Sequence, residues 1–429
     1  MTRSVSDTQV HHGTSTSIQP DLVPSTDSPI DRSRPWFSIH PNLASYALHT
    51  MSNGCNSASK PSLSNALVEL SGACDLRPTC FELRNSKKVG DRPVDAGNFG
   101  DVWKGVIEGQ TQQETLNVSL KIMRVYQKTE IKAAIKEFGC EAVIWRQLSH
   151  PNLLPFLGLY YVEDRPCLVS PWIENGDLVQ FLRGAPPDTD HTSLILDIAM
   201  GLAYLHNENI VHGDLKGKNI LVAPSGAACI CDFGLSSVVS SIRFTQSKSG
   251  GPSGTARWQA PELLSGDSVN HYGSDIYAFG CVCYEILSGK VPLHHLANAA
   301  VAVQVVYKGA RPKRPEPWRD DEVYNGIWEL MEDCWKTDPD ARPTAAQIVQ
   351  RLVDPPIGAK PTKSGMDWDD AFSSRFRHWS QDCPLLLSIS EIEAIIFEGD
   401  IAEVNINTPI DGQIDLPLQK GEIVARSAA

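Results

Sequence analysis

The residues best suited to chemistry lie in two short segments. The first reads His-Gly-Asp-Leu-Lys-Gly-Lys-Asn and ends at Asn219, and the second reads Asp-Phe-Gly and begins at Asp232, thirteen residues later. Asp214 can accept a hydrogen bond from an attacking hydroxyl, and Lys216 can neutralise charge on a group in transfer. The amide of Asn219 and the carboxylate of Asp232 offer oxygen ligands of the kind that Mg²⁺ prefers. Together the segments indicate phosphoryl transfer assisted by a divalent metal.

A phosphate-binding turn is a further requirement of that chemistry. The stretch Ala-Gly-Asn-Phe-Gly-Asp-Val spans Ala96–Val102 at an expected strand turn. Glycine lets backbone N–H groups approach phosphate oxygens that a side chain would keep away. Only Gly97 and Gly100 fit a G-x-G-x-x-G pattern, because Asp95 occupies the first position. Taken alone, the stretch fits an ordinary β-turn better.

A lysine and a glutamate upstream of the catalytic segments are expected to pair. Lys121 ends the sequence Val-Ser-Leu-Lys inside the expected strand Leu116–Val125, and Glu141 lies beside the apolar stripe of a helix expected over Thr129–Leu148. A buried charge without a partner is costly. We therefore predict a Lys121–Glu141 ion pair that holds the ammonium against the phosphates.

The elements that must position these residues fall into two groups. Alternating apolar residues predict a small, mostly antiparallel sheet with one helix, and apolar residues at steps of three and four predict a mainly helical region after Gly176. Strands are expected within Val94–Ile107, Leu116–Val125, Leu159–Pro171 (two strands), Ile220–Ala223 and Cys229–Cys231. Further helices are expected at Ser193–Asn207, Ser274–Ser288, Ala297–Lys308, Asp321–Lys336 and Thr344–Leu352.

The composition is that of a globular protein with flanking segments. Of the 429 residues, 41% are hydrophobic and 21% charged, as in ordinary folded domains. The net charge of −13 argues against nucleic-acid binding, which needs a basic surface. The eleven cysteines contain no C-x-x-C pair and favour a reducing compartment. No apolar run approaches the roughly 18–20 residues that span a bilayer, so a soluble, cytoplasmic protein is expected.

Three regions are expected along the chain. Residues 1–86 are rich in Ser, Thr, Pro and Asn, which predicts disorder, with a possible short helix near residues 62–71. Residues 87–353 form the expected catalytic domain. Residues 354–429 are an acidic tail in which we recognise no motif.

The ordered set of motifs resembles the signature of eukaryotic protein kinases. The glycine-rich turn, strand lysine, catalytic loop and Asp-Phe-Gly are followed by Ala-Pro-Glu at residues 260–262, and the resemblance covers about Lys87 to Val353. It implies an α+β, bilobal fold: a small antiparallel-sheet N-lobe with one helix and a larger, mainly helical C-lobe. It also implies ATP and Mg²⁺ as cofactors, with Asn219 and Asp232 as the metal ligands.

The resemblance also assigns the remaining site residues. Catalytic roles fall on Asp214, Lys216, Lys121 and Glu141, and contacts to ATP fall on Gly97, Gly100, Val102, Lys121, Pro171 and Ile173. The carbonyl of Pro171 and the N–H of Ile173 would bond the adenine, next to Ser170 as gatekeeper.

Three further residues have structural roles by the same resemblance. Asp275 should hold the backbone of the catalytic loop. Arg342 should pair with Glu262.

The substrate class follows from residues around the catalytic loop. Lys216 and Thr255 resemble serine/threonine kinases, since tyrosine kinases typically carry arginine and alanine in that part of the loop. Trp258 and Cys334-Trp335 resemble the tyrosine-kinase-like group of these enzymes. The expected function is transfer of the γ-phosphate of ATP to Ser or Thr hydroxyls of protein substrates in intracellular signalling. The sequence does not indicate an oligomeric state.

Three positions depart from the family pattern. Gly213 replaces the arginine that normally binds a phosphorylated activation loop, so phosphate-driven ordering of that loop is in doubt. Asp95 places a carboxylate at the first glycine position, and Ser119 replaces an alanine that packs on adenine. These departures keep a pseudokinase, acting as a nucleotide-binding or scaffolding module, as the alternative. A third possibility is that the flanking tails carry the function.

Overall fold

The computed structural model describes residues 83, 86–96, 100–108, 115–122, 142, 144–146, 148–162, 165–232, 237–238, 254–316, 321–362, 367–368 and 376. All of them belong to one compact unit within residues 41–429. The possible helix near residues 62–71 lies outside these ranges. No helix in the described ranges is long and apolar enough to cross a membrane.

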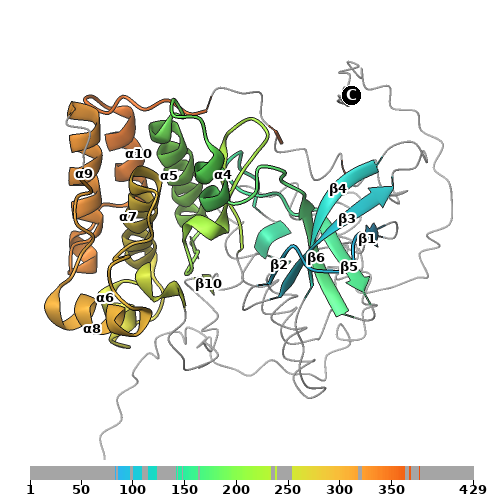
Figure 1. The fold of residues 1–429 in the computed structure, drawn as a ribbon, viewed down its shortest axis with the longest axis horizontal. Coiled ribbons are helices and arrows are strands. Elements are labelled where there is room, and N and C mark those ends of the chain that lie inside the picture. The colour runs from blue at the N-terminus through green and yellow to red at the C-terminus, as the bar shows by residue number, and fades with distance from the viewer. Residues whose placement is uncertain are drawn as a thin grey trace, which may run out of the picture. The chain divides into compact units, whose positions relative to one another are not determined.

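An antiparallel sheet forms the N-terminal part of the described structure, which we call the sheet lobe (Figure 1). Its strands are β1 (Ser86–Lys88), β2 (Asp95–Ala96), β3 (Asp101–Glu108), β4 (Thr115–Ile122), β5 (Gly158–Val162) and β6 (Arg165–Pro171). They pair in the order β1-β3-β4-β6-β5, and β2 pairs with the start of β3. This is the predicted antiparallel arrangement.

The central strand β4 shows why this sequence forms a two-faced sheet. Val118, Leu120 and Ile122 alternate along it and are almost fully buried, in an apolar cluster with residues of β3 and β6. Successive side chains of a strand point to opposite faces. Lys121 therefore lies on the face away from this cluster. Its ammonium reaches Asp232, which follows β9.

The second part, which we call the helical lobe, is built around long helices that run side by side (Figure 1). The helices are α4 (Leu178–Gly184), α5 (His191–Asn207), α6 (Pro261–Leu264), α7 (Tyr272–Ser288), α8 (Asn298–Lys308), α9 (Glu322–Cys334) and α10 (Ala345–Val353). One continuous apolar core joins α5, α7, α9 and α10. The fold class is therefore the predicted α+β one, with a sheet lobe followed by a mainly helical lobe.

Polar caps fix where these helices begin. Asp190 accepts hydrogen bonds from Thr192 and Ser193 at the start of α5. Thr344 and Gln347 form a reciprocal capping box at the start of α10. Such caps satisfy backbone N–H groups that have no partner within the helix, and each stabilises it by about 1 kcal/mol.

Two short two-stranded sheets flank the segments that were predicted to carry chemistry, residues 212–219 and 231–232. β7 (Ile210–Val211) pairs with β10 (Ser237–Val238), and β8 (Ile220–Val222) pairs with β9 (Ala228–Ile230). Residues 212–219 lie between β7 and β8 and include the 3-10 turn η3 (Gly217–Asn219). Residues 231–232 follow β9 directly. The short sheets thus bring both segments predicted to carry chemistry into one region.

The chain after α10 packs back on the helical lobe. Ile357, Ala359 and Trp368 are buried in its core. Thr362 donates from its hydroxyl to Asp197 of α5 over 2.6 Å, and Asp367 accepts hydrogen bonds from the backbone and hydroxyl of Ser225, in the turn between β8 and β9. Residues beyond α10 therefore complete the apolar core.

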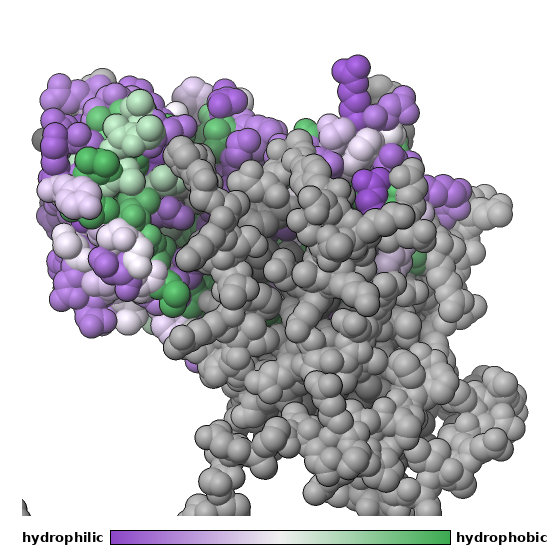
Figure 2. Space-filling model, turned by 90° about the horizontal axis from the view of Figure 1, so that it is seen from below, coloured by the Kyte–Doolittle hydropathy of each residue, from purple (hydrophilic) through white to green (hydrophobic). Residues whose placement is uncertain are grey.

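Helix α8 has apolar residues on more than one side. Val301 and Val305 are buried in a small cluster with Leu293, whereas Val303 and Tyr307 are 51% and 83% exposed. Apolar side chains are visible at the surface of the helical lobe in Figure 2. Scattered exposed apolar residues are usual on folded proteins, and nothing in the described structure covers these.

Replacing Trp368 with alanine should destabilise the helical lobe although the residue lies beyond α10. The indole is 6% exposed within the core, and truncating a buried tryptophan costs about 3–5 kcal/mol. We expect a clear fall in the midpoint of thermal or urea unfolding.

Lys360→Ala is the matched control, because Ser193 bonds the backbone carbonyl of Lys360 and alanine retains it. An unchanged unfolding midpoint in Trp368→Ala would show that the segment after α10 does not contribute to the core.

Candidate active site

A buried carboxylate on α7 holds the first half of the catalytic loop. Asp275, 1% exposed, accepts the backbone N–H groups of His212 and Gly213 over 2.8 and 2.9 Å. Burial alone would raise the pKa of Asp275, but the hydrogen bond and charge of His206 and the loop N–H groups outweigh it, so the pKa is lowered. The predicted role of Asp275 is confirmed.

Gly213 has a backbone conformation that suits glycine. Its φ of +80° lies in the left-handed region, where a residue with a Cβ costs roughly 1–2 kcal/mol. The departure from the family pattern at this position therefore removes a local strain as well as a guanidinium group.

Asp214 is the centre of the loop. One carboxylate oxygen, Oδ2, accepts from Lys216 Nζ at 2.5 Å and from Asn219 Nδ2 at 3.2 Å. The other oxygen, Oδ1, is buried and has no hydrogen-bond partner within the part of the chain that the structure describes. A buried acceptor without a donor is costly, and a hydroxyl group of a bound molecule could satisfy it.

Asp232 is joined to the catalytic loop and to the sheet lobe. Cys231 donates its backbone N–H to the carbonyl of Asn219 over 2.9 Å, which ties the residue before Asp232 to the end of the loop. Lys121 Nζ donates to Asp232 Oδ1 over 2.6 Å. Burial would raise the pKa of Asp232, but the Lys121 charge and hydrogen bond, with His212 and Lys216, lower it. Asp232 is therefore held ionised.

The donor atoms at this point fit a hard divalent cation. Asn219 uses its amide nitrogen to bond Asp214, which leaves its Oδ1 available, and Asp232 contributes an ionised carboxylate. Among the described residues, no three or more His, Cys, Asp or Glu side chains are grouped for a metal. Two oxygen ligands from the protein, completed by phosphate and water oxygens, are typical of Mg²⁺ bound with a nucleotide.

Three of the six predicted nucleotide contacts lie on β3 and β4 or directly before β3. Val102 of β3 is paired with Lys121 of β4. A Cβ on Gly100 would lie 2.6 Å from the carbonyl oxygen of Ile122, so only glycine fits where β3 starts against the end of β4.

The end of β6 and the segment after it carry two further predicted nucleotide contacts, Pro171 and Ile173. Ser170 and Pro171 end β6, and Ser170 is paired with Ser119 of β4. Ile173 is 7% exposed. Lys104 of β3 reaches this segment through an ion pair with Glu174 of 2.8 Å, which the sequence analysis did not foresee.

Several predicted site features lie outside what the structure describes. Glu141 and Gly97 are among the omitted residues, and the side chain of Thr255 is not described. The Lys121–Glu141 pair, the phosphate contact of Gly97 and the role of Thr255 therefore stay predictions.

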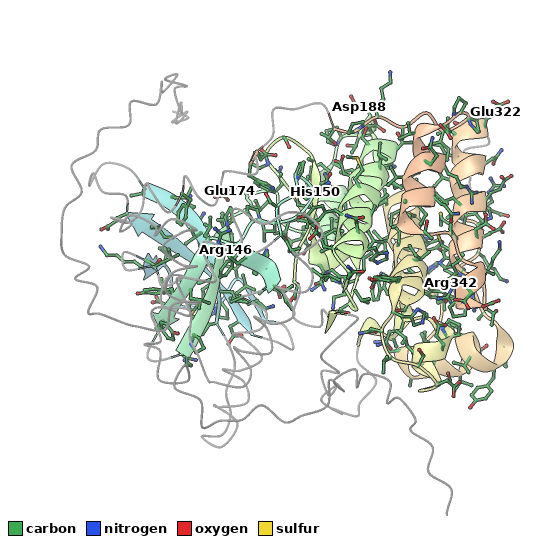
Figure 3. The ribbon with its side chains drawn as sticks, turned by 180° about the vertical axis from the view of Figure 1, so that it is seen from behind. Arg146, His150, Glu174, Asp188, Glu322 and Arg342 are labelled. Atoms are coloured by element: carbon green, nitrogen blue, oxygen red, sulfur yellow. The ribbon has the colours of Figure 1, made fainter. Side chains whose placement is uncertain are left out.

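Glu262 and Arg342 form the predicted structural ion pair. Arg342 donates to both carboxylate oxygens of Glu262 over 2.7 and 2.9 Å, and it lies among the helices of the helical lobe (Figure 3). Burial raises the pKa of Glu262, but the bonds from Arg342 and His271 outweigh it and lower it to about 2. The segment that carries Ala-Pro-Glu is thereby fixed to the loop before α10.

One buried residue that contacts the catalytic loop was not predicted from the sequence. Glu285 of α7 is 5% exposed, and its Oε2 accepts from the backbone of Gly217 in the catalytic loop and from the indole of Trp258. The available signal was its position as the lone charged residue in the apolar run 276–287. A buried charge in such a run needs partners.

Comparison with known proteins shows similar catalytic domains in larger proteins. Serine/threonine-protein kinase STY17 of Arabidopsis thaliana is 31% identical over 269 residues, which cover 61% of this chain and 43% of that protein. Serine/threonine-protein kinase CTR1 of the same plant is 32% identical over 299 residues, 68% of this chain and 34% of that protein. The chain thus spans less than half the length of these relatives.

A family model described as protein tyrosine and serine/threonine kinase matches residues 89–352, which is more than half of the chain. The match encloses the catalytic loop, Asp232 and the Glu262–Arg342 pair, and it confirms the resemblance predicted from the motifs. The chain therefore belongs to the protein tyrosine and serine/threonine kinase family.

Proposed function

We propose that the protein is an ATP-dependent kinase that transfers the γ-phosphate to Ser or Thr hydroxyls of protein substrates. The observation that carries the proposal is the buried Oδ1 of Asp214, which has no hydrogen-bond partner in the described structure. The same carboxylate contacts Lys216 and Asn219, and the backbone bond from Cys231 to Asn219 joins this loop to the Lys121–Asp232 pair. These are the groups that phosphoryl transfer requires.

Each residue has a distinct part in the proposed reaction. Asp214 Oδ1 accepts the hydrogen bond of the substrate hydroxyl and orients its oxygen for attack. Lys216, held 2.5 Å from the other oxygen of Asp214, places positive charge next to the group in transfer. Bound ATP with Mg²⁺ supplies the phosphoryl group, and Asn219 and Asp232 would hold the metal. Lys121 would contact phosphate oxygens from its position on β4.

The choice of Ser/Thr over Tyr rests on Lys216. Its ammonium already contacts Asp214 in the described structure, as the resemblance to serine/threonine kinases implies. The relatives STY17 and CTR1 also carry serine/threonine-protein kinase in their names. The protein substrates, and the expected cytoplasmic location, stay predictions.

The pseudokinase alternative is less favoured. Asp214, Asn219 and Asp232 retain the residue types that catalysis needs. Asn219 bonds Asp214, and Cys231, directly before Asp232, bonds the carbonyl of Asn219. A scaffold would not require a buried carboxylate oxygen without a donor, because that oxygen is a net cost to folding.

Asp214→Asn should abolish phosphate transfer from labelled ATP with Mg²⁺ to a generic acceptor protein. The amide keeps the shape of the side chain but is a poor acceptor for the hydroxyl proton, so we expect a loss of about 100-fold or more in kcat. Acid hydrolysis of the labelled product should yield phosphoserine or phosphothreonine.

Asp188→Asn is the matched control, because Asp188 is exposed in the loop before α5 (Figure 3). Equal transfer by native protein and Asp214→Asn would contradict the assigned role. No transfer by folded native protein, together with no thermal shift on adding ATP and Mg²⁺, would favour the pseudokinase.

The activity should depend little on phosphate in the activation segment. Gly213 has no side chain to bind a phosphoryl group there, so removing such phosphate should leave the catalytic loop held by Asp275 as before. The measurement is kcat before and after phosphatase treatment, with loss of phosphate verified by mass spectrometry. A collapse of activity on dephosphorylation would show that another residue takes over the task of the missing arginine.

A further inference from the structure

Two described residues beyond α10 are buried in different lobes. Trp368 lies in the apolar core that joins α5, α7, α9 and α10. Phe376, 5% exposed, lies in the apolar cluster of the sheet lobe with residues of β3, β4 and β6. All other described members of that cluster come from residues 83–169. The chain after α10 therefore contributes one buried aromatic side chain to each lobe.

A series of hydrogen bonds holds the first part of this chain segment on the helical lobe. The carbonyl of Lys360 accepts a hydrogen bond from the first turn of α5 over 2.7 Å, and the hydroxyl of Thr362 donates to Asp197, further along α5. Asp367 then accepts from Ser225 in the turn between β8 and β9. In Figure 1 the trace that leaves α10 runs past α5. The segment is thus fixed at three successive points on the helical lobe.

Phe376 covers the face of the sheet that points away from the predicted nucleotide contacts. Val118 and Leu120 of β4 belong to the same apolar cluster as Phe376, and Lys121 lies on the opposite face because successive side chains of a strand alternate. The Phe376 ring therefore does not enter the predicted ATP site. It can influence nucleotide binding only through the position of the sheet lobe.

The chain between the two aromatic residues is short. Eight positions separate Trp368 from Phe376, and eight residues span at most about 26–29 Å. Residues 172–177, between β6 and α4, form the connection at which the described chain first passes from the sheet lobe to the helical lobe. The segment after α10 returns to the sheet lobe and is a second connection. While both aromatic side chains stay buried, the lobes can separate only as far as this short chain allows.

We propose that the chain after α10 tethers the two lobes, with Trp368 as its anchor in the helical lobe and Phe376 as its anchor on the outer face of the sheet lobe. By limiting the separation of the lobes, the tether favours the arrangement in which Lys121 of β4 meets Asp232. A ligand binds more tightly when the arrangement that it needs is already populated. The tether should therefore strengthen nucleotide binding. This effect rests on the proposed function, whereas the docking of Phe376 does not.

The short link also determines which sheet lobe Phe376 occupies. Because Trp368 is buried in the helical lobe eight positions earlier, Phe376 is held near its own sheet lobe at an effective concentration on the order of millimolar. A second copy of the chain would have to compete with that concentration. The occupant is therefore the protein's own Phe376.

Phe376→Ala tests the docking. Removing the ring leaves the outer face of the sheet uncovered, so we expect the amides of β4 and β6 to exchange with deuterium about 10-fold faster or more. Val89→Ala is the matched control, because Val89 is an apolar residue of the same lobe that is 45% exposed and lies outside the cluster. Native exchange rates in Phe376→Ala would overturn the docking.

Lengthening the tether tests its effect on the lobes while keeping both anchors. About ten Gly and Ser residues are inserted between Trp368 and Phe376, which costs little closure entropy, so β4 and β6 should exchange as in the native protein. The amides of Trp172 and Gly176, which bond the carbonyls of Asn117 and Ile173, should exchange faster because the lobes separate further. The Kd for ATP with Mg²⁺, measured by calorimetry, should rise about 3- to 10-fold.

The same insertion placed after Ala429 is the matched control and should change neither quantity. Native exchange at Trp172 and Gly176 in the lengthened protein would contradict the tether, even if Phe376 is docked. Faster exchange there with an unchanged Kd would overturn its role in nucleotide binding.

Hydrogen exchange needs neither ATP nor phosphate transfer, so it separates this inference from the proposed function. Faster exchange at Trp172 and Gly176 in the lengthened protein, without any transferase activity in the native chain, would support the tether and contradict only the proposed function. Light scattering gives the molecular mass as a further measurement. A native dimer that becomes a monomer in Phe376→Ala would show that Phe376 docks on a second copy, and the tether within one chain would be rejected.

Discussion

The bond between Asp275 and the backbone of His212 and Gly213 is the constraint on which the rest of the site depends. The carboxylate is almost fully buried, where an ionised group is tolerated only with strong partners, and it obtains them from the loop N–H groups and from His206. Residues 212–216 of the loop in turn lie in no helix or strand that could satisfy their backbone. The carboxylate and the loop backbone therefore stabilise each other. The position of Asp214 is set by α7, which carries Asp275, more than by the loop itself.

The ion pair between Lys121 and Asp232 connects the sheet lobe to the region of the catalytic loop. It joins groups 111 positions apart in the sequence, and it brings β4 to the residues that follow β9. The same lysine is the one expected to contact phosphate oxygens, so a bound nucleotide would compete for a charge that the fold already uses.

Much of the fold could be predicted because its helices and strands follow from patterns of apolar and capping residues over short stretches of sequence. The helices α5, α7 and α8 begin and end within about two residues of their predicted bounds, since apolar spacing and caps act over a few positions. Glu285 could not be placed in the same way. Its partners Gly217 and Trp258 are 68 and 27 positions away in the sequence. The periodicity of apolar residues does not indicate which distant N–H group a buried carboxylate will bind. The packing of Trp368 in the core was missed for the same reason, because a single tryptophan in a polar stretch has no pattern.

The two left-handed residues of the site show how strain and function are balanced. Asp232 has a φ of +65°, and it carries that conformation because its carboxylate is needed; Asp tolerates the left-handed region better than most residues with a Cβ. Gly213 has a φ of +80° without any such cost. A side chain at this position would be strained, and binding a phosphorylated segment is the benefit that could offset that strain. Asp275 and Glu285 already bind the loop backbone before and after Asp214. A further anchor is therefore not required to position Asp214. The glycine is therefore consistent with a catalytic loop whose order comes from α7 and not from phosphorylation.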